Sequence, residues 1–330
     1  MAMVSGWAPS GLEPGRVRRC ALLVLTALAT AAAAFVPPTA QERAAALGDL
    51  GEETTALQRL LQPDGDFAPI PEPAPGDWLA NHREPGQTYA QFCRAPRVRP
   101  DASRRVIYLQ PLGEFPAAVS PPLEELRSYV AAFFQMEVKV LPAVRPAAGQ
   151  FQTREFPGTG RRQVLTTSVM AWLAGRMPAD ACCLVGVTME DLYPDPSWNY
   201  VFGQASLDEG VGIYSFARYD PAFWHETRPA GCADLILRRS CKVLTHEIGH
   251  ILGLYHCVYF SCLLNGANNL AEDDASPLHV CPVCLRKLHR AVGFDAVQRY
   301  EELEAFYRRH GWADEADWVR RQLSKIDPGF

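Results

Sequence analysis

Residues 246–256 constrain this chain more than any other segment, and they read HEIGHILGLYH. If the segment begins in a helix, His246 and His250 project from one face about a turn apart and can share one metal ion. A glycine can take the left-handed conformation that ends a helix, so Gly253 lets His256 turn back toward the same ion. This spacing is typical of zinc sites.

Glu247 follows the first histidine and lies beside the metal-binding face without being a natural third ligand. Three histidines leave the fourth position of a tetrahedral zinc ion open to water, which distinguishes catalytic zinc sites from closed structural ones. A carboxylate beside that position can act as the base for the water molecule. The segment therefore predicts a zinc site with Glu247 as its acid/base. The alternative is a chance arrangement, which is weak in a chain with only 8 histidines.

Four cysteines come directly after this segment. Cys257 and Cys262 form a C-x4-C pair, and Cys281 and Cys284 form a C-x2-C pair. The spacing suits four thiolates around one structural zinc ion. Disulfides or reduced buried cysteines are the alternative. The polar stretch 263–280 between the pairs predicts a loop.

The two motifs together resemble one known family. HEIGHILGLYHC followed by CPVCLRKLH resembles the archaemetzincins, zinc metallopeptidases with an adjoining four-cysteine zinc site. Residues 76–82 (GDWLANH), 185–194 and 197–219 are similar to the archaemetzincin-2 type, so the resemblance spans roughly residues 76–300. It implies Glu247 as the acid/base, a catalytic zinc on His246, His250 and His256, and a second zinc on Cys257, Cys262, Cys281 and Cys284.

One position departs from the family pattern. Archaemetzincins carry a methionine on a turn beneath the catalytic zinc, two residues after the second cysteine, where this chain has Leu264. Leucine is apolar and of similar volume, so it can fill the floor of the site with a small loss of packing quality.

The pattern of elements predicts an α/β fold. Strand-like runs at 105–112, 138–141 and 182–188 alternate with helical patterns at 123–134 and 164–173. Residues 295–309 and 313–326 have helical periodicity. Together with the resemblance, this predicts a metzincin-like catalytic domain with a mixed sheet, an active-site helix and a C-terminal helical part.

Residues 202–219 alternate in part and precede the zinc-binding helix. We expect an edge strand here. Such a strand could hold an extended peptide through main-chain hydrogen bonds, which makes Gly212, Ile213 and Tyr214 candidate substrate contacts. An ordinary inner strand is the alternative.

The start of the chain has the layout of a targeting segment. Three arginines within residues 16–19 precede an apolar, alanine-rich run that ends near residue 36. Residues 1–36 are therefore predicted to be a leader for the secretory or plastid route. A mitochondrial leader and a retained membrane anchor are the alternatives. Residues 37–75 are predicted to be an N-terminal extension with a short helix and a Pro-rich linker or strap, and residues 76–330 the catalytic domain.

Composition limits the function classes. The chain is 48% hydrophobic and 21% charged, which is ordinary for a globular protein. Its formal net charge of −5 and scattered basic residues argue against nucleic-acid binding.

We predict a zinc metallopeptidase with two zinc ions, one catalytic and one structural, that acts on peptide or protein substrates and binds no membrane unless the leader is retained. The alternative is a non-catalytic zinc-binding protein whose metals serve folding or a partner interface. The sequence does not decide between an endopeptidase and an aminopeptidase.

Overall fold

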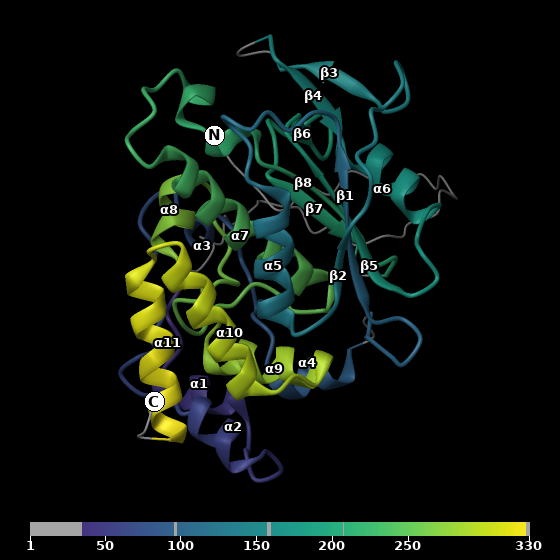
Figure 1. Cartoon of the computed structure of the whole chain (residues 1–330). Helices are drawn as coiled ribbons and strands as arrows, with labels where there is room; N and C mark the ends of the chain where they lie inside the picture. Colours follow the sequence, from purple (N-terminus) through teal and green to yellow (C-terminus); the bar gives the residue numbers. More distant parts are fainter. Residues whose placement is uncertain (1–34, 96–97, 157–159, 207, 328–330) are drawn as a thin grey trace, which may run out of the picture.

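The computed structural model describes residues 35–95, 98–156, 160–206 and 208–327 (Figure 1). The predicted leader, residues 1–36, lies outside the described residues except for its last two positions. Within the described ranges, no helix combines the length and the apolar character needed to cross a membrane.

A five-stranded sheet forms the centre of the fold. The strand order is β2-β1-β5-β8-β7, in which β7 is antiparallel to its neighbour and the other pairs are parallel. Every residue of β1, β5 and β8 is buried, as expected for apolar strands covered on both faces. The strands are β1 (Val106–Leu112), β2 (Val138–Val140), β5 (Ala181–Thr188), β7 (Gly203–Ser206) and β8 (Val211–Ser215). The three predicted strands and the mixed sheet are confirmed.

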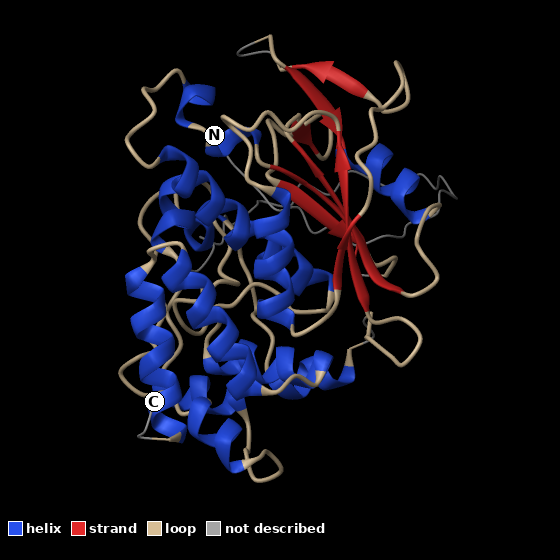
Figure 2. Ribbon diagram, in the orientation of Figure 1, coloured by secondary structure: helices blue, strands red, loops and turns tan. Residues whose placement is uncertain are grey.

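Helices cover both faces of this sheet. Helices α5 (Leu123–Phe134) and α7 (Cys232–Ile251) pack on one side, and α6 (Thr166–Ala174) packs on the other (Figure 2). Helix α5 has the predicted bounds. The predicted helix at 164–173 began too early, because Val164 and Leu165 end strand β4 of a small second sheet. Apolar residues at a strand-helix junction fit either element.

The second sheet has the order β3-β4-β6. Its strands are β3 (Thr153–Glu155), β4 (Arg162–Leu165) and β6 (Asp191–Tyr193). Asp191 accepts a hydrogen bond of 2.6 Å from Nε of Arg218, and both side chains are almost fully buried. This ion pair ties the small sheet to the chain that follows β8.

The C-terminal part is helical, as predicted. Its helices are α9 (Pro282–Val292), α10 (Ala296–Arg309) and α11 (Ala313–Ile326) (Figure 1). Helix α10 packs on α5 and on α11, whereas α9 packs against the N-terminal helices of the chain. The stretch between the cysteine pairs, predicted to be a loop, also contains the short helix α8 (Leu270–Ala275). The α/β class with a mixed sheet, an active-site helix and C-terminal helices is confirmed.

The N-terminal extension packs onto the same core. It forms two short helices, α1 (Ala40–Leu47) and α2 (Thr55–Leu60), where one was predicted. The Pro-rich segment that follows is a strap: Ile70 donates its backbone N–H to Tyr259, and Ser261 donates to Ala68. The domain boundary at residue 76 stays a prediction. The remaining short helices are α3 (Trp78–Asn81) and α4 (Tyr89–Arg94).

The edge-strand prediction was wrong for the residues proposed to contact substrate. Gly212, Ile213 and Tyr214 lie on β8, which pairs with β5 on one side and with β7 on the other. Their main-chain groups are used within the sheet, and the side chains of Ile213 and Tyr214 are fully buried. Residues 202–219 contain a hairpin, and only its first strand, β7, lies at the edge. Alternating apolar residues occur on inner and edge strands alike, so the sequence did not separate the two.

Candidate metal centres

The C-terminal end of α7 brings the three histidines together. The helix ends at Ile251, and Gly253 has a φ of 89°, so the chain reverses as predicted. The ligand nitrogens of His246, His250 and His256 all lie within 4.8 Å of one another, and Nε2 of His246 is 2.9 Å from Nε2 of His250. Zinc–nitrogen bonds of about 2.0–2.1 Å place two ligands of a tetrahedral ion about 3.3 Å apart. The group therefore fits one zinc ion.

Each ring is oriented by a hydrogen bond from its other nitrogen. Nδ1 of His246 donates to the carbonyl of Leu263 at 2.8 Å, and Nδ1 of His250 donates to the carbonyl of Leu254 at 2.6 Å. Nδ1 of His256 lies 2.6 Å from Oε1 of Glu84. These bonds fix the tautomer in which Nε2 carries no proton and can bind a metal ion.

Burial keeps the helix histidines neutral. Desolvation and the neighbouring histidines lower the pKa of His246 well below its usual range, and lower the pKa of His250 to about 3. A metal ligand must be the neutral imidazole, so both rings are ready to bind a cation at neutral pH.

Glu247 directly follows His246 on α7 and is only 3% exposed. Burial raises the pKa of its carboxyl group to about 8. A nearby divalent cation favours the ionised form and so opposes this shift. A carboxyl group whose pKa is brought close to neutral is suited to accept and return a proton.

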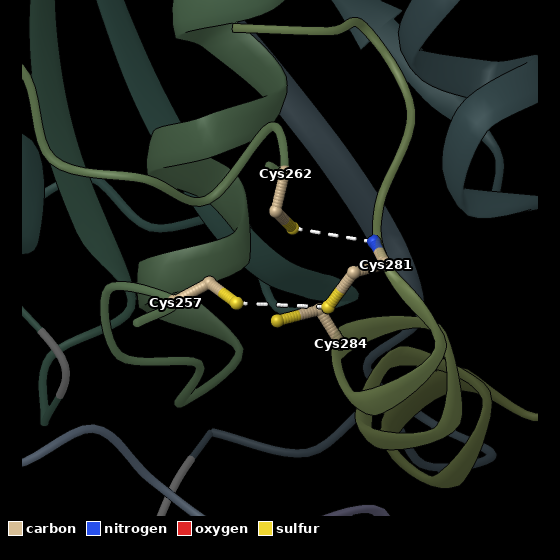
Figure 3. Close-up of side chains that lie close together, drawn as sticks. All are labelled: Cys257, Cys262, Cys281 and Cys284. Carbon is tan, nitrogen blue, oxygen red and sulfur yellow. Dashed lines mark hydrogen bonds between the residues drawn. The ribbon is translucent and has the colours of Figure 1, made fainter. Parts of the chain in front are cut away.

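The four cysteines form a second cluster. Their sulfur atoms lie within 4.8 Å of one another, and Sγ of Cys257 is 3.6 Å from Sγ of Cys281 (Figure 3). A disulfide requires about 2.05 Å, whereas two thiolates on one tetrahedral zinc ion are about 3.8 Å apart. All nine cysteines of the described residues are free. The arrangement thus fits the predicted zinc cluster and not the disulfide alternative.

The buried position of the four cysteines disfavours their ionised, thiolate form. Burial opposes ionisation of Cys257, but hydrogen bonds from the other three cysteines lower its pKa. Burial raises the pKa of Cys262 and Cys281 well above the usual range. Four thiolates in this buried position therefore require a cation.

Leu264 lies between the two centres. Its side chain is 1% exposed, and its Cδ1 atom would lie 3.3 Å from a Cβ atom built on Gly249 of α7. Its backbone N–H is 3.5 Å from Sγ of Cys262. The leucine thus packs against the zinc-binding helix in the place expected for the family methionine.

Sequence reasoning missed Glu84. This residue is 172 positions from His256, and no spacing rule connects the two. The similarity noted at residues 76–82 ends two residues before it. A glutamate between arginine and proline in a Pro-rich stretch carries no signal of its own, so only the fold could bring it to the site.

The geometry of the histidine cluster is that of a zinc metallopeptidase. Sequence comparison with known proteins points to the same class. The model of Peptidase family M54 matches residues 180–290. Archaemetzincin-2 from Rattus norvegicus is 39% identical over 282 residues, which cover 77% of this chain and 79% of that protein. The human archaemetzincin-2 is also 39% identical, with 76% and 78% covered. The chain therefore belongs to the archaemetzincin family, and it is a zinc-dependent peptidase.

A solved structure was also found to be similar. The archaemetzincin from Archaeoglobus fulgidus, determined with malonate, is 30% identical. The match covers 55% of this chain and 99% of that chain, with a TM-score of 0.43.

The packing of Leu264 predicts how the floor of the site responds to change. Leu264→Ala leaves a cavity beneath α7 and should destabilise the protein by about 2 to 5 kcal/mol. Leu264→Met keeps the volume and should cost less than about 1.5 kcal/mol. Urea unfolding of the zinc-loaded variants measures both. Equal stability of the alanine variant and the unmodified protein would show that Leu264 does not support the helix.

Proposed function

We propose that this chain hydrolyses peptide bonds at a zinc ion held by His246, His250 and His256, with Glu247 as general acid/base. We further propose that Cys257, Cys262, Cys281 and Cys284 hold a second, structural zinc ion. One observation carries the proposal: three imidazole nitrogens lie within 4.8 Å of one another at the end of α7, and the residue after the first of these histidines is a buried glutamate outside the ligand cluster.

Zinc, when bound, polarises the scissile carbonyl and makes water a better nucleophile at neutral pH. Glu247 accepts the proton that the attacking water gives up and returns it to the leaving amine. The helix holds this carboxyl group and His246 on adjacent residues, so little reorganisation is needed during the reaction. The three histidine rings keep their orientation through their hydrogen bonds to Leu263, Leu254 and Glu84.

The substrate is proposed to be a peptide or protein. Strand β7 lies at the open edge of the sheet and packs against α7. We propose that an extended peptide adds as a further strand along the outer main-chain groups of β7. This role replaces the one predicted for Gly212, Ile213 and Tyr214.

A nucleic-acid partner does not suit a net charge of −5. The secretory or plastid route is proposed from residues 16–36 of the sequence alone.

Removing the proposed base should separate metal binding from turnover. Glu247→Ala keeps the three histidines, so zinc content should be unchanged while peptide hydrolysis falls by at least about 100-fold, the usual contribution of a general base. Zinc is measured by elemental analysis and hydrolysis by mass spectrometry of a peptide substrate.

Glu301→Gln on the exposed face of α10 is the matched control and should retain full activity. Residual activity near that of the control in the Glu247 variant would remove this residue from the mechanism.

Removing one thiolate tests the second zinc ion. Cys281→Ser should lower the zinc content by one ion per chain and reduce soluble yield and melting temperature, because structural zinc contributes about 10–16 kcal/mol of apparent binding energy in small peptides. Cys232→Ser, at a half-buried cysteine outside the cluster, is the control. A well-folded Cys281 variant with unchanged zinc content would contradict a structural ion at this site.

A further inference from the structure

An N-terminal arm, defined here as residues 76–87, crosses the turn that carries His256. The arm joins the Pro-rich strap to α4 and includes α3. It lies outside residues 180–290, the part of the chain that the family model matches. Three of its side chains, Trp78, Glu84 and Gln87, contact the zinc-binding turn directly.

The first contact is made by Glu84. Its Oε1 atom accepts hydrogen bonds from Nδ1 of His256 at 2.6 Å and from Nε1 of Trp78 at 2.7 Å. The side chains of Glu84 and His256 are only 20% and 8% exposed, so water screens this contact weakly. The Trp78 ring also packs edge-on against the His256 ring, with centroids 5.1 Å apart. The indole thus orients the carboxylate and the imidazole together.

The second contact is made by Gln87, which is 3% exposed. Its Nε2 donates to the carbonyl of Gly253 at 3.1 Å, and its Oε1 accepts from the N–H of Tyr255 at 3.4 Å. One amide group therefore satisfies both sides of the turn between the second and third histidines. Gly86 has a φ of +68°, and a Cβ atom there would lie 2.5 Å from Val258, so the arm backbone touches the turn closely.

The arm is also anchored at its other end. Trp78 donates its backbone N–H to Oε1 of Glu272 at 2.8 Å, and Asn268 donates from Nδ2 to the carbonyl of Gly76 at 3.0 Å. Gly266 has no room for a side chain, because a Cβ atom there would lie 2.5 Å from the Trp78 ring. These contacts tie α3 to α8 and its preceding loop, and so fix the position from which Glu84 reaches the histidine.

The three histidines are not held alike. His246 and His250 stand on the rigid helix α7, and each donates to a backbone carbonyl. His256 stands on the loop after the Gly253 turn, and a charged carboxylate from the arm orients it. A carboxylate on the outer nitrogen fixes the ring and makes it a more basic ligand. The least constrained of the three rings thus has the strongest outer partner.

We propose that Glu84 is a positioning residue of the catalytic centre: the arm holds His256 in its ligating orientation and thereby sets how tightly the active-site zinc is retained. The inference rests on the proposed zinc centre. Glu84 acts through His256 and not on the reacting atoms, so its loss should weaken metal binding more than it slows turnover of the zinc-saturated enzyme.

The experiment measures zinc affinity of the active site in the full chain by competition with a chromophoric chelator. Glu84→Gln keeps the shape and the acceptor oxygen but removes the charge, and should weaken zinc binding about 10- to 100-fold. Glu84→Ala, which removes both, should weaken it further. With zinc in excess, kcat of Glu84→Gln should return to within a few-fold of the unmodified protein.

Glu72→Gln, an exposed glutamate on the preceding strap, is the matched control and should bind zinc like the unmodified protein. The zinc ion of the cysteine cluster is the internal reference and should be retained in every variant. Loss of zinc from both centres together would mean that Glu84 only supports the fold, and would overturn the proposal.

Unchanged zinc affinity in Glu84→Gln would also overturn it. If that variant does not fold, Trp78→Phe replaces it, since this change removes the indole N–H that orients Glu84. The Trp78 variant should show a smaller loss of affinity, and equal affinity would count against the proposal. Failure of the unmodified protein to bind zinc through its histidines would instead refute the proposed function.

Discussion

The proposed catalytic centre depends on holding three imidazole rings where they can share one cation. Two of them come from a single helix and need only its geometry, but the third must be delivered by a chain reversal at Gly253. A ring on a loop is free to turn away unless its outer nitrogen is engaged. The surrounding elements supply those outer partners: the cysteine loop provides the carbonyl of Leu263, and the N-terminal arm provides Glu84.

The two candidate metal centres are physically linked through this arrangement. Leu263 and Leu264 directly follow Cys262, and the first orients His246 while the second packs beneath α7. A cation that fixes the four sulfurs would therefore also fix the floor of the active site. Burial disfavours charged side chains in and beside both clusters. It lowers the pKa of His246 and raises the pKa of Glu247 to about 8. It also raises the pKa of Cys262 and Cys281. A divalent cation is what such an interior needs to hold ionised ligands.

Features governed by local spacing could be predicted from the sequence. The helix with His246 and His250, the reversal at Gly253 and the approach of the two cysteine pairs follow from periodicity and short motifs. Features set by long-range pairing could not. Placing Gly212 on an inner strand requires knowing that β7 covers its outer side, and Glu84 reaches His256 across 172 residues of chain. A run such as Val164–Leu165 suits a strand or a helix equally, and only pairing with β3 and β6 decides it.

The most direct test of the account is zinc-dependent cleavage of a mixed peptide library, read by mass spectrometry. The same preparation is assayed zinc-loaded, stripped of its active-site zinc by a chelator, and reloaded. The account predicts product peptides that disappear on stripping and return on reloading, and their termini show whether the enzyme cuts internally or trims ends. No products from the zinc-loaded protein, or the same products with and without zinc, would contradict it.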